Sequence, residues 1–244
     1  MVHGSAAQRL HEDLNRIIST AEPGEQLPSE PGLAQQLGVS RATLREAMRI
    51  FETQGLISRR QGVGTFVLRP ANVIESGLEV LESIETQAKA IGLPVTFGEL
   101  EMVCRPADET EAKALELDEG AEIMHISRVI LAENRPVAYL IDTLPADVIT
   151  CEEIEVNFSG SVLDLLLTRG DPVLVNSRCE ISAVAASSEI ARLLNLQRGD
   201  ALLRFVSSLY DVGGKVMDYS LSYFIPGYFR FHVVRQVGGF GTIG

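Results

Sequence analysis

The sequence lacks the features that mark membrane proteins, disulfide-rich secreted proteins and metalloproteins. No uninterrupted apolar run approaches the ~18 residues that a membrane-spanning helix needs, and the N-terminus shows no apolar secretory segment. The three cysteines are widely spaced without a Cys-x-x-Cys pair, and the four histidines are scattered. We therefore expect a cytoplasmic protein with no membrane partner, with neither a metal nor another cofactor, and with buried, reduced thiols at Cys104, Cys151 and Cys179.

Basic residues are also scarce, and they are unevenly placed. The net charge of the 244 residues is −12, and residues 1–70 hold eight arginines, no lysine and seven acidic residues. The remainder carries 13 basic and 26 acidic side chains, so the acidic excess belongs to the second part of the chain. An acidic protein binds DNA only if its positive groups gather on one surface, and such binding weakens strongly with salt.

Residues 27–67 have the pattern of a winged helix-turn-helix, a unit that binds DNA. The pattern predicts a short helix from about Ser29, a tight turn at residues 37–39 and a second helix that opens at the N-cap Ser40. An apolar stripe at i, i+3, i+4 and i+7 faces inward on the second helix and consists of Leu44, Ala47, Met48 and Phe51.

Another side of this second helix carries arginines at intervals of four, namely Arg41, Arg45 and Arg49. We interpret the helix as a recognition helix, in which Arg41 and Arg45 reach base edges and Arg49 contacts the DNA backbone. The alternative for a bare arginine triplet is an ordinary solvated helix face. The helix-turn-helix pattern and the basic hairpin that follows favour recognition.

A basic, glycine-rich hairpin is predicted after the second helix. Gly55 is the expected residue at which the helix stops, and short strands are expected at residues 56–57 and 66–67. The turn between them, from Arg59 to Thr65, contains glycines that let a backbone approach a sugar or a phosphate. We interpret this hairpin as the wing of the motif, although an ordinary hairpin turn is an open alternative for Gln61, Gly62 and Gly64.

These motifs resemble the GntR superfamily of bacterial transcription regulators over residues 1–70. The matching pieces are PGEQLPSE, LAQQLGVSRATLREAM, QGLI and GVGTFV. The motif and the resemblance together predict a set of DNA contacts: Ser29, Ser40, Arg41, Thr43, Arg45, Arg49, Gln61, Gly62, Gly64 and Thr65. The chain departs from the family's pattern at Pro31 and Gly32, where a basic residue followed by an acidic one is usual, so one familiar DNA contact is missing.

Residues 70–94 are predicted to connect the DNA-binding unit, residues 1–69, to a second domain, residues 95–244. A hinge is expected at residues 69–72, and an amphipathic helix should follow and end near Gly92 and Pro94. Its apolar positions at helical spacing are Leu78, Leu81, Ile84 and Ala88. Transmission of motion and simple packing are both open roles for this helix.

The second part contains a weak internal repeat, residues 108–145 and 187–226. Each copy reads as a short helix, Leu-x-Leu, a glycine, a strand, a tight turn and another strand. The matched positions are Leu115, Leu117 and Gly120 against Leu194, Leu196 and Gly199. A two-stranded ribbon is not stable alone, so we expect the two ribbons to join in one antiparallel sheet covered by helices. Further strands are expected at about residues 96–105 and 173–184, and a helix near Ser161, which makes an α+β domain.

This second part resembles the UTRA effector domain of the HutC-type branch of GntR regulators, a domain with a chorismate-lyase-like fold. The motifs are LELDEGAEIMHISRV, GSVLDLLLTRG and KVMDYSLSYFIPGYFRF. The resemblance implies a homodimer with a pocket for a small metabolite, anionic or sugar-like, lined by Arg128, Ser161, Glu180, Asp218 and Tyr223. The family often has a second arginine two places after the first, where this chain has Ile130, and this departure weakens the case for a phosphorylated sugar.

We therefore predict a ligand-responsive transcription regulator, expected to be a repressor and not an enzyme, that binds a pseudo-palindromic double-stranded DNA operator as a homodimer. One alternative is an enzyme of lyase-like fold fused to a DNA-binding head, because the resembled fold also hosts a lyase. A second alternative is an all-helical effector domain that binds a metal through Asp and His. The strand-turn-strand repeats argue against this second alternative.

Overall fold

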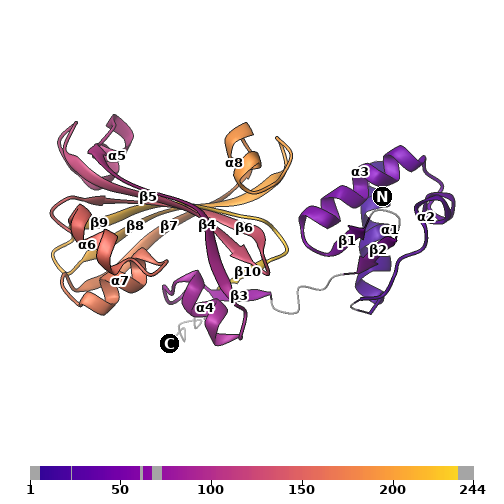
Figure 1. Cartoon of the computed structure of the whole chain (residues 1–244), viewed down its shortest axis with the longest axis horizontal. Helices are drawn as coiled ribbons and strands as arrows, with labels where there is room; N and C mark the ends of the chain where they lie inside the picture. The colour runs from indigo at the N-terminus through magenta and orange to yellow at the C-terminus, as the bar shows by residue number, and fades with distance from the viewer. Residues whose placement is uncertain (1–5, 23, 61–62, 68–72, 236–244) are drawn as a thin grey trace, which may run out of the picture.

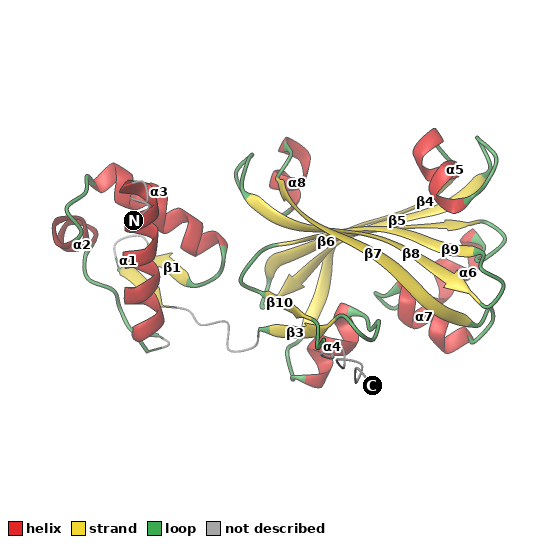
Figure 2. Cartoon of the chain, turned by 180° about the vertical axis from the view of Figure 1, so that it is seen from behind, coloured by secondary structure: helices red, strands yellow, loops and turns green. Residues whose placement is uncertain are grey.

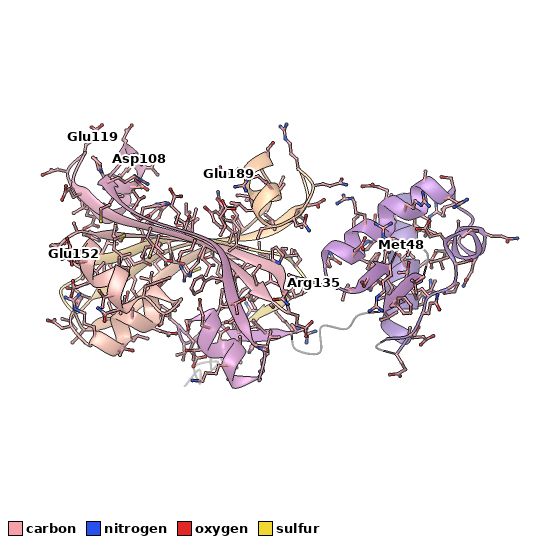
Figure 3. The ribbon with its side chains drawn as sticks, in the orientation of Figure 1. Met48, Asp108, Glu119, Arg135, Glu152 and Glu189 are labelled. Atoms are coloured by element: carbon pink, nitrogen blue, oxygen red, sulfur yellow. The ribbon has the colours of Figure 1, made fainter. Side chains whose placement is uncertain are left out.

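The computed structural model describes residues 6–22, 24–60, 63–67 and 73–235, which form two parts (Figure 1). The smaller, N-terminal part is helical with one hairpin, and the larger part is a six-stranded sheet with helices on both faces. Figure 3 shows Arg135 at the end of the sheet nearest to the N-terminal part, whereas Asp108 and Glu119 lie at the opposite end. The predicted α+β fold class is confirmed, and the all-helical alternative is wrong.

Three helices and a hairpin make up the N-terminal part. Their bounds are α1 Ala6–Thr20, α2 Glu30–Gln36, α3 Arg41–Thr53, β1 Ile57–Arg60 and β2 Gly64–Val67. The predicted apolar stripe of α3 is confirmed, since Leu44, Met48 and Phe51 are each at most 1% exposed. They pack in one core with Leu14 of α1 and Leu33 of α2. Helix α1, which the motif did not include, therefore supplies one wall of the core that supports α3.

The ends of α3 follow the predicted caps. The Ser40 hydroxyl accepts a hydrogen bond from the Thr43 amide at 3.1 Å. Just after the C-cap Gln54, Gly55 takes a φ of +67°, a left-handed conformation that favours glycine. Local sequence signals thus fix where this helix starts and stops.

The C-terminal sheet has the strand order β4-β5-β6-β9-β8-β7, and all its neighbouring strands are antiparallel. The strand bounds are β4 Val95–Pro106, β5 Glu122–Ala132, β6 Arg135–Pro145, β7 Leu174–Ala185, β8 Ala201–Asp211 and β9 Val216–Phe224. The ribbons predicted from the repeat are β5–β6 and β8–β9, and the two further predicted strands are β4 and β7. The ribbons meet where β6 pairs with β9, so the two repeats are related by an approximate twofold axis.

The repeat extends to the backbone conformation. Glu116 and Asn195, each between the two matched leucines, have φ angles of 57° and 56°. The matched Gly120 and Gly199 have φ angles of 80° and 93°. The same left-handed turns therefore lead from each short helix into its ribbon, which explains why the sequence echo survives at these positions.

Helices cover both faces of the sheet (Figure 1; Figure 2). Helices α5 (Glu109–Leu115) and α8 (Ser188–Leu193) lie on one face, and α4 (Ile84–Ala90), α6 (Cys151–Asn157) and α7 (Val162–Arg169) lie on the other. The predicted helix near Ser161 is α7, and the Ser161 hydroxyl caps it by accepting from the Asp164 amide at 3.1 Å.

The connector helix is shorter than predicted, because only its second half is helical. Residues 74–77 instead form strand β3 (Ile74–Gly77), which pairs in parallel with β10 (Phe229–His232). Helix α4 begins after its N-cap Ser83, so Leu78 and Leu81 lie outside it and are 41% and 50% exposed. Pairing with a segment far away in the sequence overrides the local helical periodicity, and the local pattern does not contain that information.

The prediction of buried, reduced thiols is wrong at two positions. Cys104 on β4 is exposed and disulfide-bonded, and Cys179 on β7 is exposed and free. Both lie on the edge strands of the sheet, β4 and β7. The side chain of Cys151 lies outside the described part of the structure.

Candidate DNA-binding surface and effector cavity

The outer side of α3 gathers the predicted arginines on one surface. A hollow in this surface is lined by Arg41, Arg45, Arg49 and Arg59, together with Ala42 and Glu46. At the start of the same helix, the Ser40 and Thr43 hydroxyls lie 2.8 Å apart and are exposed. A capped helix N-terminus beside several guanidinium groups is suited to a phosphate backbone.

Three of these arginines are paired with carboxylates within the N-terminal part, and one of the three is Arg49, which donates to Glu46 at 3.1 and 3.2 Å. Arg45 donates to Glu30 at 2.6 Å, and Arg59 donates to Glu52 at 2.7 Å. The side chains of Arg45 and Arg59 are 56% and 28% exposed. Ion pairs with this exposure contribute about 0–1 kcal/mol, so a phosphate is able to replace the carboxylate.

Arg49 is engaged by the other part of the molecule. Two of its nitrogens lie 2.9 and 3.0 Å from the Asp200 carboxylate. Asp200 is the last residue of the loop between α8 and β8. The hydrogen bond to Asp200 raises the pKa of Arg49 above its ordinary value, although burial opposes this shift. Burial likewise favours the neutral form of Asp200, but hydrogen bonds from Arg49 and the Gln197 amide hold the pKa of this carboxyl below its ordinary value. The predicted backbone contact Arg49 is therefore occupied by an interdomain ion pair.

A second contact joins the two parts. A methyl group at Gly227 would lie only 2.6 Å from the Gln54 carbonyl oxygen, and one at Gly55 would lie 2.4 Å from the Tyr228 hydroxyl. The C-terminal end of the recognition helix therefore rests directly on the loop before β10. The Arg49–Asp200 pair is part of an interface rather than a single bridge.

The structure describes only some of the hairpin residues that were predicted to contact DNA. Gly64 has a φ of +140°, and the Arg60 guanidinium lies over the Phe66 ring at 5.1 Å from its centroid. Thr65 is only 6% exposed, which leaves its side chain little surface for DNA, and contact of Thr65 with DNA stays a prediction. The alternation of β2 turns this residue toward the core. Gln61 and Gly62 lie outside the described residues.

Ser29 has a structural role at the start of α2. Its exposed side chain is the N-cap of α2 and accepts from the Gly32 amide at 3.4 Å. Pro31 lies in the first turn of α2, where a missing amide hydrogen is tolerated. Contact of Ser29 with DNA stays a prediction, as it does for Ser40, Arg41, Thr43, Arg45, Arg49 and Gly64.

The C-terminal domain contains a cavity of about 760 Å³ on the face of the sheet that α4 and α7 cover. This volume lies within the range of about 300–1,000 Å³ that is typical of small-molecule sites. Its walls come from strands β5 to β9 of the sheet, from α4 and α7, from the segment between β3 and α4, and from β10. Three of the five residues predicted for the pocket line it, namely Arg128, Ser161 and Asp218.

Arg128 is surrounded by carboxylates at the bottom of this cavity. It is 3% exposed, donates to Asp142 on β6, and its Nε lies 3.8 Å from Glu85 Oε1 on α4. Its guanidinium also lies 5.7 Å from the centroid of the Phe158 ring. Although burial opposes its charge, the carboxylates of Asp142 and Glu85 raise the pKa of Arg128 above its ordinary value. Arg128 is thus already compensated by the protein's own acids.

Asp218 is buried beside this group. It is 6% exposed on β9, and burial, together with the neighbouring Asp142 carboxylate, raises its pKa well above the ordinary aspartate value. Burial also raises the pKa of Glu85, which Arg128 offsets in part. Perturbed acids at a cavity wall are typical of functional sites.

Glu180 and Tyr223 do not line the cavity, so the structure corrects both pocket assignments. Glu180 is exposed on β7 and accepts from Arg178 at 2.8 Å. Tyr223 stacks with Tyr139 on the opposite face of the sheet, with ring centroids 6.4 Å apart. Side chains alternate between the two faces along a strand, so an error of one residue in the matched position moves a side chain out of the pocket.

Sequence reasoning missed the two acids that contact Arg128. Asp142 is the one charged residue in the mostly apolar stretch LIDTLP of β6, and a lone carboxylate in such a strand is a signal that could have indicated it. Glu85 lies in the first turn of α4, where an acidic residue is an ordinary feature of a helix start. No local signal distinguishes it.

Two negative observations concern only the described part of the chain. None of its helices is long and apolar enough to cross a membrane. No group of three or more His, Cys, Asp or Glu side chains there is arranged to hold a metal ion.

Comparison with known proteins agrees with this architecture. Residues 4–67 match the gntR family of bacterial regulatory proteins, and residues 92–230 match the UTRA domain. The chain is 30% identical over 218 residues to the transcriptional repressor NagR of Bacillus subtilis, covering 88% of each chain. It is 29% identical over 181 residues to the histidine utilization repressor of Pseudomonas putida, covering 74% of this chain and 71% of that one. The crystal structure of PhnF from Mycobacterium smegmatis superposes with a TM-score of 0.62 at 24% identity, covering 94% of this chain and 100% of that one.

The fold and the two sites define a class of protein, a winged-helix DNA-binding transcription regulator that responds to a ligand in its second domain. The chain belongs to the GntR family, in the HutC-type branch that carries a UTRA domain. The resemblance noted from the sequence is therefore confirmed.

Proposed function

We propose that the protein is a homodimeric repressor whose affinity for a pseudo-palindromic DNA operator is controlled by a small molecule bound in the C-terminal cavity. One observation carries the proposal. A single segment, residues 76–85, lines the cavity that holds Arg128 and follows closely on the chain that leaves the arginine-bearing DNA-binding part. The domain with the cavity and the DNA-binding part are thus joined through a segment that a ligand in the cavity would contact.

DNA recognition is assigned to the start of α3. Arg41 and Arg45 lie in its first two turns, on the exposed side, and the four-arginine hollow extends this surface to β1. Bidentate contact of one arginine with guanine contributes about 1–3 kcal/mol of sequence discrimination. Two such units in a homodimer read half-sites about 34 Å apart, which explains the expected pseudo-palindrome.

The direction of control follows the relatives. Both curated relatives described above are named repressors, and NagR covers the DNA-binding and effector parts of this chain alike. A ligand changes operator affinity only by the difference in its affinity for two states of the protein. The contact between the two parts at Asp200 and Gly227 could be present in one of these states and absent in the other.

The test begins with operator DNA selected from random sequence by the purified protein. Fluorescence anisotropy then compares the wild-type protein with Arg45→Ala and with Arg16→Ala, a matched exposed arginine on α1. We expect at least about a tenfold loss for Arg45→Ala and little change for Arg16→Ala. Light scattering measures the mass of the complex. Equal affinity for selected and scrambled DNA would exclude sequence-specific recognition, and a complex with one chain would exclude the dimer.

A further inference from the structure

The described residues that line the cavity carry a strong negative excess. Five of them are acidic, and they are Glu79, Glu82, Glu85, Asp142 and Asp218. Arg128 is the one basic side chain among these lining residues, and it is already bonded to Asp142 and close to Glu85. A phosphate or carboxylate placed here would face more negative than positive charge, and its hydration would be lost without compensation.

Three buried polar atoms at this site have no hydrogen-bond partner within the described structure. They are Glu85 Oε1, Arg128 Nε and Asp218 Oδ1. Asp218 and Arg128 are 6% and 3% exposed, and both line the cavity. Leaving such an atom unpaired is costly, and native proteins rarely do so without a functional reason. Glu85 Oε1 and Arg128 Nε face each other at 3.8 Å, too far apart for a hydrogen bond, and Asp218 Oδ1 is the second carboxylate oxygen that lacks a donor.

The remaining walls show what else the ligand presents. Ser207, Ser220 and Ser222 line the cavity from β8 and β9, beside Asp218. Hydroxyl groups of this kind exchange hydrogen bonds with hydroxyls of a ligand. Farther along the same two strands, Phe205 and Phe224 join Phe231 in an aromatic cluster, with ring centroids 4.4 Å apart for Phe231 and Phe205 and 4.9 Å apart for Phe231 and Phe224. Such rings receive an apolar body or the flank of an organic cation.

We propose that the ligand of this cavity is a small organic cation, a protonated amine that also carries hydroxyl groups, rather than a phosphate or a carboxylate. The ammonium group lies between Asp218 and Glu85 and supplies donors to their unpartnered oxygens. This inference rests on the proposed role of the cavity as the effector site. It departs from the anionic ligand that the family resemblance allowed.

The experiment measures thermal stability of the full chain with compounds matched in skeleton and different in charge. One set is glucosamine, glucose and glucose 6-phosphate, and a second is tyramine, 4-ethylphenol and 3-(4-hydroxyphenyl)propionate, each at about 10 mM. A ligand that binds only the folded state raises the melting temperature. We expect a rise with at least one amine that its neutral and anionic counterparts do not give. A larger rise with a phosphate or carboxylate, or no rise with either amine, would overturn the proposal.

Two variants tie the effect to the cavity. Asp218→Asn keeps the shape but removes the carboxyl group that an ammonium ligand would ionise, and we expect it to weaken binding of the amine by at least about tenfold. Glu180→Gln removes an exposed carboxylate on the other face of the same sheet and should bind the amine normally. Equal binding by Asp218→Asn and wild type, measured by calorimetry, would refute the assignment. Because calorimetry measures binding directly, this comparison holds even if the variant differs from wild type in thermal stability.

Operator binding, measured with the same compounds, separates this inference from the proposed function. If an amine stabilises the protein but leaves operator affinity unchanged, the cation site stands and its role as effector site fails. If a phosphate stabilises the protein and changes operator affinity, the effector role stands and the cation inference fails.

Discussion

The interdomain ion pair makes a quantitative prediction about DNA binding. In the arrangement described here, Asp200 holds Arg49 through two charge-assisted hydrogen bonds of 2.9 and 3.0 Å, so Arg49 is not free to contact DNA. Asp200→Asn removes the negative charge, while its remaining carbonyl oxygen can still accept from the Gln197 amide, as Asp200 does at 2.9 Å. We expect this variant to bind operator more tightly in the absence of ligand.

The size of the effect follows from the exposure of the pair. The side chains of Arg49 and Asp200 are 19% and 13% exposed, so the bidentate pair belongs at the upper end of the 0–1 kcal/mol range for surface pairs, at about 1 kcal/mol. If the docked state predominates, apparent affinity is proportional to the fraction of undocked protein. Weakening the docked state by about 1 kcal/mol then raises operator affinity about fivefold.

The assay is fluorescence anisotropy with labelled operator at fixed salt. Asp211→Asn is the matched control, because its carboxylate also accepts backbone hydrogen bonds in its own turn, at 2.8 Å from the Gly213 and Lys215 amides. It removes the same charge without touching the DNA-binding part. If Asp200→Asn binds operator no more tightly than Asp211→Asn, the ion pair does not restrain Arg49 and the reasoning is refuted.

Three further predictions concern DNA contact, stability and pH. Arg45→Ala should weaken operator binding by at least about tenfold without changing the circular-dichroism spectrum, and wild-type affinity would remove Arg45 from the interface. Arg128→Met should lower the free energy of unfolding by about 3–5 kcal/mol in urea titrations, because it leaves Asp142 unpaired, and adding Asp142→Leu should recover most of it. The raised pKa of Asp218, which lies beside Asp142 and Arg128 and lines the same cavity as Glu85, means that the native state binds more protons than the unfolded state above the ordinary aspartate pKa of about 3.9. Stability should therefore fall as pH rises through the raised pKa, and a urea midpoint with the same pH dependence in Asp218→Asn would contradict this.

The predictions that held rest on signals local to the chain. The caps at Ser40 and Gly55 and the stripe of Leu44, Met48 and Phe51 are properties of one helix, and the structure reproduces them. The repeat also predicted the joined ribbons, because two marginal hairpins of the same pattern are most stable in one sheet. These features need no knowledge of distant contacts.

The predictions that failed depend on contacts between distant segments. Leu78 and Leu81 have helical spacing, but parallel pairing of β3 with β10 places them outside a helix. Asp200 had no signal, since its partner Arg49 lies in another domain. The pocket was predicted in part: Asp218 faces it, whereas Tyr223 lies five residues later and points to the other face. Odd spacing along a strand changes the face, and only the register decides which residue is inside.

The unpartnered polar atoms of the cavity give a physical route by which a bound ligand controls DNA binding. Each unpartnered buried polar atom destabilises the free protein by about 1–3 kcal/mol, and Glu85 Oε1 and Asp218 Oδ1 face the same space from α4 and from β9. A ligand that bonds to both oxygens fixes α4 against the sheet, and with it residues 76–83, which precede the helix. A tenfold change in operator affinity requires a coupling free energy of only about 1.4 kcal/mol. One hydrogen bond to the Glu85 carboxylate, present in one position of the segment and absent in the other, is sufficient to supply it.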